Sequence, residues 1–178
     1  MKNLIITVLI IVGFSCSQQA TESEKSAPSK SLHEATFFGD VKIVNQHIAA
    51  GTDLNQKDDY GSTPLNVAIT FDKTEVAIAL INGGADLTIT APDGSTPLHS
   101  AAFFGRTAIV KALLDKKVDR EEKNQYGATP LEAISAPFSA LRPIYDQLSK
   151  DLGPFGFKLD YDALQLAHDE IKLILQQP

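Results

Sequence analysis

Few side chains in this sequence have the types and spacing that catalysis or metal binding requires. Among its 178 residues there are four histidines and one cysteine, Cys16. No two histidines stand three or four residues apart, the spacing that puts two ligands on one face of a helix. A nucleophilic serine needs a positioned histidine and an acid, whereas the serines here cluster in polar and turn-like stretches, as surface residues do. We therefore expect no catalytic residue, no metal and no cofactor.

The charge of the chain bears on nucleic-acid binding. The formal net charge is −6 at pH 7, and no run of lysine and arginine interrupts the acidic balance. Binding to nucleic acid depends on cationic side chains that neutralise phosphates. We therefore expect no nucleic-acid partner.

The N-terminal residues have the pattern of an export signal. Lys2 precedes an apolar run without charged residues, Leu4–Phe14. As a helix this run would span roughly 17 Å, too short for a bilayer core of about 30 Å. A signal peptide at 1–15 fits better. Cys16 directly follows it and resembles the lipidated cysteine of bacterial lipoproteins; an ordinary signal peptide cleaved nearby is the alternative.

The residues after the cysteine predict a tether. In 16–30 no apolar residue after Cys16 is larger than alanine, so the segment cannot bury enough surface to offset the entropy of ordering it. We expect the protein to be lipid-anchored to the bacterial envelope, at the outer membrane or facing the periplasm, rather than freely secreted. The membrane contact would be the N-terminal lipid only.

The rest of the chain is repetitive. YGSTPLNVA begins at Tyr60, DGSTPLHSA at Asp93 and YGATPLEAI at Tyr126, so their threonines stand 33 residues apart. SLHEATFFGD, from Ser31, is a related stretch one period earlier. Each threonine can cap a helix with its hydroxyl, and the proline that follows suits the first helical position.

This pattern resembles the ankyrin repeat, which has the same period and a Thr-Pro-Leu-His-x-Ala signature. The resemblance covers Lys30 to about Leu148. It implies an all-α solenoid of stacked helix pairs joined by hairpin-like turns, in one domain over 31–178. The repeats would lie at about 31–57, 58–90, 91–123 and 124–152.

The C-terminal part departs from the pattern. Pro137 and Pro143 interrupt the fourth repeat. Apolar residues at helical spacing then predict a capping helix over about 160–176, which would cover the end of the stack. Leu164 falls 33 residues after Leu131, so this helix is alternatively the remnant of a fifth repeat. The solenoid is expected to have four to five units.

The resemblance also implies roles for particular residues. His33 and His99 hold the position whose histidine normally bonds the turn to the helix, where the other repeats have Asn66 and Glu132. Partners of ankyrin proteins usually bind the concave side, made of the turn tips and the exposed end of the first helix. Carried over to this chain, the helix ends are Phe37, Phe38, Thr70, Phe71, Phe103 and Phe104. The turn tips are Asp59, Tyr60, Pro92, Asp93, Gln125 and Tyr126.

These helix ends hold five phenylalanines in three successive repeats. Aromatic anchors framed by polar residues are typical of binding hot spots. The alternative is that one ring of each phenylalanine pair packs between repeats while its neighbour stays partly exposed.

Three functions remain open on the sequence. The first is a non-enzymatic, monomeric scaffold that binds another protein through the concave face. The second is a periplasmic inhibitor or immunity-type protein that occludes one toxin or enzyme. The third is an enzyme that uses residues 136–178, although Tyr145, Tyr161 and the carboxylates of that segment are dispersed along it.

Overall fold

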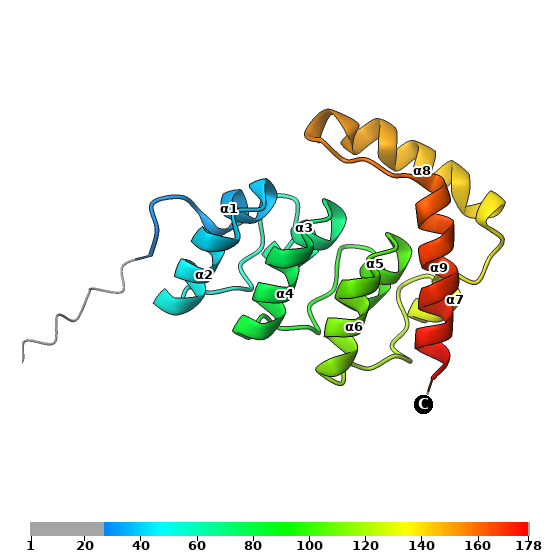
Figure 1. The fold of residues 1–178 in the computed structure, drawn as a ribbon, viewed down its shortest axis with the longest axis horizontal. Coiled ribbons are helices and arrows are strands. Elements are labelled where there is room, and N and C mark those ends of the chain that lie inside the picture. The colour runs from blue at the N-terminus through cyan, green and yellow to red at the C-terminus, as the bar shows by residue number, and fades with distance from the viewer. Residues whose placement is uncertain (1–26, 178) are drawn as a thin grey trace, which may run out of the picture.

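The computed structural model describes residues 27–177. The predicted signal peptide, Cys16 and most of the predicted tether lie outside the described residues. Within the described range the regular structure is entirely helical, which confirms the all-α prediction (Figure 1). Its elements are α1 (Leu32–Phe38), α2 (Val41–Ala50), α3 (Pro64–Thr70), α4 (Thr74–Gly83), α5 (Pro97–Phe103), α6 (Thr107–Asp115), α7 (Pro130–Ala133), α8 (Phe138–Leu152), the 3-10 turn η1 (Gly153–Phe155) and α9 (Tyr161–Gln176).

The first helix of each repeat begins where the sequence predicts. The hydroxyls of Ser31, Thr63, Thr96 and Thr129 each accept a hydrogen bond from the backbone N–H three residues further on. A proline follows each of the three threonines at the start of the helix, where no N–H is needed. A cap of this kind stabilises a helix by about 1 kcal/mol.

The helices stack in two rows (Figure 1). In the first row α1 packs on α3, α3 on α5, and α5 on α7; in the second row α2 packs on α4, and α4 on α6. One apolar core runs through the stack, with Leu65, Leu98 and Ile109 almost fully buried. Each pair buries its apolar side only against its neighbours, as in other solenoids.

The second row ends with α9, which packs on α6, α5 and α7. Its apolar stripe, with Leu164, Ile171 and Leu175, is buried there. This arrangement corrects the predicted fourth repeat at 124–152: the repeat is built from α7 and α9. The helix predicted at about 160–176 covers the end of the stack, and since it packs on α6 and α7 as the second helix of the fourth repeat, it is not the remnant of a fifth.

Residues 136–160 form an insert between the two helices of the fourth repeat. The insert consists of α8, η1 and a return segment, residues 156–160. In Figure 1, α8 runs across the top of the stack from α9 toward α3. Most of α8 is exposed, and only Leu141 and Tyr145 are buried on it. The apolar side of α8, with Leu141 and Tyr145, forms a separate cluster with Leu164 of α9, and it is α9 that occupies the place in the second row.

Candidate protein-binding surface

The turn tips project aromatic side chains into solvent. We call the hairpin-like turns fingers, at residues 58–62, 91–95 and 124–128. At the tips, Tyr60 is 84% exposed and Tyr126 is 75% exposed. The Asp58 carboxylate accepts hydrogen bonds from the N–H groups of Tyr60, at 3.0 Å, and Ser62, at 2.8 Å. Asn124 accepts the equivalent bond from Tyr126, so both tyrosines stand on turns of fixed shape.

Neighbouring fingers contact each other. The N–H of Gln125 donates to the carbonyl oxygen of Asp93 at 3.2 Å. A Cβ on Gly94 would lie 3.0 Å from the nitrogen of Gln125, so glycine permits this approach. Asp59, Pro92 and Gln125 are exposed, while Asp93 is half-buried.

Histidines bond two of the fingers to the preceding repeat. His33 Nε2 lies 3.1 Å from the carbonyl oxygen of Ser62, and His99 Nε2 lies 2.9 Å from that of Ala128. Asn66 stands at the same position in the second repeat, but both polar atoms of its buried amide lack a partner. Glu132, in the last repeat, turns back to accept the N–H of Thr129 at 2.8 Å; this hydrogen bond lowers the pKa of the Glu132 carboxyl.

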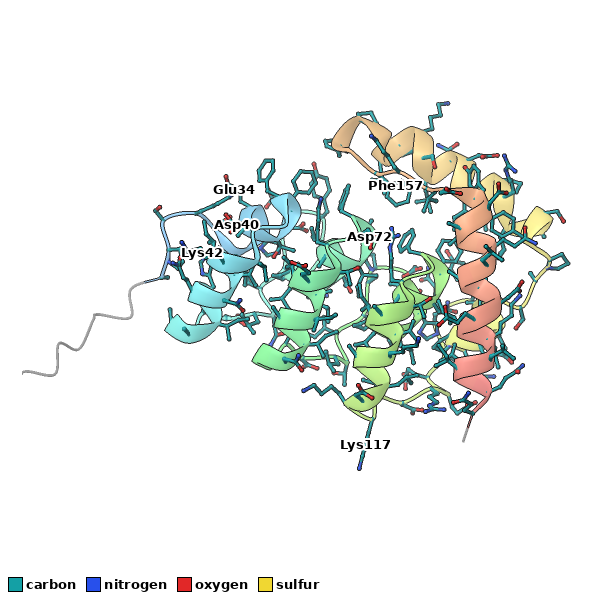
Figure 2. All side chains as sticks on the ribbon, in the orientation of Figure 1. Glu34, Asp40, Lys42, Asp72, Lys117 and Phe157 are labelled. Carbon is teal, nitrogen blue, oxygen red and sulfur yellow. The ribbon has the colours of Figure 1, made fainter. Side chains whose placement is uncertain are left out.

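The ends of the first helices carry a row of aromatic rings. The ring of Phe37 lies 4.9 Å from that of Phe71, centroid to centroid. Phe71 is followed by Phe157 at 6.4 Å, and Phe157 by Phe104 at 5.7 Å. Phe157 comes from the return segment of the insert and is only 3% exposed. Figure 2 shows it projecting from the insert toward the stack.

The row is therefore only partly open to solvent. Phe38 is 65% exposed and faces outward beside half-buried Phe37, as expected for a pair with one packed ring. Phe71, Phe103 and Phe104 are half-buried, and so is Thr70. The prediction placed these residues on a free surface; the insert covers part of it. Phe157 was not predicted, because the stretch 153–157 lies outside the repeats and has no periodic pattern that would distinguish Phe157 from Phe155.

Comparison with known families agrees with this geometry. A family model described as ankyrin repeats (3 copies) matches residues 32–125. The chain belongs to the ankyrin repeat family. The match covers the three helix pairs α1 to α6 and ends in the last finger, so the insert and α9 lie outside it. No curated protein matches the chain. Proteins of this family generally act as binding scaffolds for other proteins.

An arginine fixes the helix end between the second and third ankyrin repeats. Arg106 Nε donates to the carbonyl oxygen of Ile69 at 3.2 Å, and its Nη2 donates to that of Thr70 at 3.3 Å. Its Nη1 lies 3.1 Å from Asp72. Burial lowers the pKa of the Arg106 guanidinium, and the negative charge of Asp72 opposes this. The positive charge of Arg106 thus lies at the C-terminal end of α3, where the helix dipole favours a cation. It stabilises the helix end that carries Phe71.

The base of the insert is bonded to the third ankyrin repeat. Tyr145 donates its hydroxyl to the carbonyl oxygen of Phe103 at 2.7 Å, and His168 Nε2 lies 3.0 Å from the same oxygen. Burial raises the pKa of the Tyr145 phenol and lowers that of the His168 imidazole. Both side chains thus serve as neutral donors to the end of α5.

These contacts bear on the enzyme alternative. The hydroxyl of Tyr161 donates to Asp146 at 2.7 Å, whereas that of Tyr145 donates to the carbonyl oxygen of Phe103, so the two phenols have different hydrogen-bond partners. In residues 27–177 there is no group of three histidine, cysteine or acidic side chains that could hold a metal ion.

No helix in that range has the length and apolar composition needed to cross a bilayer.

Proposed function

We propose that this protein is a non-enzymatic scaffold, held to the bacterial envelope by a lipid on Cys16, that binds a partner protein through its fingers and first-helix ends. The observation that carries the proposal is the exposure of Tyr60 and Tyr126, at 84% and 75%. They occupy the same finger position, two repeats apart. Large aromatic side chains on rigid turns, surrounded by polar residues, are the usual anchors of protein interfaces.

Phe38 extends this surface at the other end of the first helices. Its ring is 65% exposed and lies 4.8 Å from the Nζ of Lys30. Together Phe38, Tyr60 and Tyr126 form the exposed aromatic set. Each histidine within residues 27–177 is engaged in a hydrogen bond that joins parts of the fold, which supports a structural rather than catalytic use of these side chains.

Comparative affinity capture from the native envelope tests the binding surface. Tyr60→Ala/Tyr126→Ala should lose a protein that the wild type captures. Lys42→Ala/Glu75→Ala removes two exposed side chains from α2 and α4, in the second row, and should capture that protein as the wild type does. If the wild type and the tyrosine variant captured equal amounts of that protein, the fingers would not be part of the interface.

Cell fractionation tests the anchor. Cys16→Ser should move the protein from the detergent-extracted membrane fraction to the soluble fraction, whereas Ser17→Ala should leave it on the membrane. The anchor proposal is wrong if Cys16→Ser sediments with membranes as the wild type does.

A further inference from the structure

The insert places one of its own side chains where the ankyrin family binds partners. We call Phe71 and Phe104 the aromatic socket; they stand at corresponding helix-end positions in the second and third repeats. The ring of Phe157 lies between them, 6.4 Å from Phe71 and 5.7 Å from Phe104. The plane of the Phe157 ring makes an angle of 90° with that of Phe71 and 75° with that of Phe104. Both are the edge-to-face arrangement that aromatic pairs favour. The socket therefore holds a ring from an extended stretch of chain.

The far part of the insert is attached to the stack by apolar contact. Within the described range, no hydrogen bond or ion pair joins residues 146–158 to residues 32–135. Phe155, two residues before Phe157, is 60% exposed at the tip. Backbone bonds at the tip stay within the insert: Gly156 donates to Gly153, and Phe157 donates to Leu152.

The base of the insert is attached much more firmly. Tyr145 is fully buried, with 0% exposure, and donates to the carbonyl of Phe103. Leu141, Tyr145 and Leu164 form a separate apolar cluster there. The hydrogen bond and the apolar cluster that hold the base therefore do not involve Phe157.

We propose that the aromatic socket is a binding site for a single phenylalanine-sized side chain on an extended protein segment, and that Phe157 is its resident, displaceable ligand. The inference rests on the proposed function, because it takes the helix ends as partner-binding positions. A partner that delivers such a side chain competes with Phe157. Its apparent affinity is reduced by the fraction of molecules whose socket is filled.

Binding of the chain's own tip in trans tests the proposal without any envelope partner. The probe is a fluorescent peptide with the sequence of residues 153–160, GPFGFKLD. The full chain carrying Phe157→Ala should bind it about tenfold or more tightly than the wild type, because its socket is vacant. Phe155→Ala is the matched control, since that ring is exposed, and should bind the peptide as weakly as the wild type.

Two altered forms of the peptide, each with one phenylalanine replaced, provide a matched comparison. Replacing its second phenylalanine, the counterpart of Phe157, with alanine should abolish binding to the Phe157→Ala protein. Replacing its first phenylalanine, the counterpart of Phe155, should leave binding within about twofold. Equal affinity of the wild type and Phe157→Ala for the peptide would overturn the proposal, as would equal binding of the two altered peptides.

Hydrogen exchange of the wild type provides a measurement that does not depend on a variant that folds. The amide of Phe157, which donates to the carbonyl oxygen of Leu152, should exchange at least about tenfold faster than those in the middle of α3 and α5, through local opening of the tip. If the tip amide exchanged only when the whole protein unfolds, Phe157 would be a fixed part of the core and the proposal would be wrong. If the peptide and exchange experiments fail while the finger variant still loses its partner, the proposed function stands without the displaceable tip.

Discussion

His99 Nε2 lies 2.9 Å from the carbonyl oxygen of Ala128, at the base of the next finger. His33 makes the same bond to Ser62, 29 residues further on. The corresponding pair in the second repeat is Asn66 and Ser95, but the shorter amide does not make the bond and is buried without a partner. One of the three finger attachments is therefore missing.

Replacing Asn66 should repair that attachment. Asn66→His places an imidazole where Ser95 offers its carbonyl oxygen, and it removes an unpaired buried amide. We expect the free energy of unfolding to rise by about 1 kcal/mol, and Tm to rise by about 2–4 °C for a chain of this size. Differential scanning calorimetry measures both. The matched change His99→Asn should lower Tm; a lower Tm for Asn66→His would contradict this view of the fingers.

The packing of α9 against the stack should require glycine at position 105. Its φ is +68°, and a Cβ there would come within 2.7 Å of Leu164 Cδ1. Gly127 has a similar φ, +73°, but a Cβ on it would meet nothing within 4 Å. Gly127→Ala should thus reveal the backbone strain alone, about 1 kcal/mol. Gly105→Ala should cost about 3 kcal/mol, because the buried Leu164 side chain and Ala167, whose Cβ lies 3.1 Å from the added Cβ, must also give way. Urea unfolding compares them, and equal losses would mean that α9 does not depend on this contact.

Stability should fall at mildly acidic pH because of His168. Burial lowers the pKa of this imidazole in the folded state, with Lys172 adding to the effect while Phe103 and Asp169 oppose it. The unfolded state takes up a proton near the ordinary histidine pKa of about 6.5. The stabilisation is therefore complete above about pH 6.5 and is lost as pH falls toward the lowered folded-state pKa.

The comparison of two proteins isolates this effect. Urea unfolding of the wild type should give a smaller free energy at pH 5.5 than at pH 7.5. His168→Gln should be less stable at pH 7.5 and should lose less on acidification. Parallel pH profiles for the two proteins would assign the acid sensitivity to other groups.

The sequence was sufficient to predict the regular part of the stack. Thr63, Thr96 and Thr129 cap their helices as their spacing predicts, because a cap depends on residues only three positions apart. The apolar stripe of α9 also identified it as the helix that covers the end.

The course of the chain through the fourth repeat could not be predicted in the same way. Both α8 and α9 follow α7 with helical sequences, and the choice between them depends on long-range packing such as that of Leu164 on Gly105. The same holds for the binding surface. Repeat positions located Phe71 and Phe104 on the helix ends, but the ring between them comes from Phe157, more than 50 residues further along the chain.

The surface that contacts the partner protein can be mapped by site-specific photo-crosslinking in intact cells. A photoreactive amino acid would replace Tyr60 or Tyr126 on the fingers, or Glu75 on α4 as the control on the second row. The same protein adduct is expected from both finger positions and none from Glu75. An adduct from Glu75 with none from either finger would show that the fingers do not hold the partner.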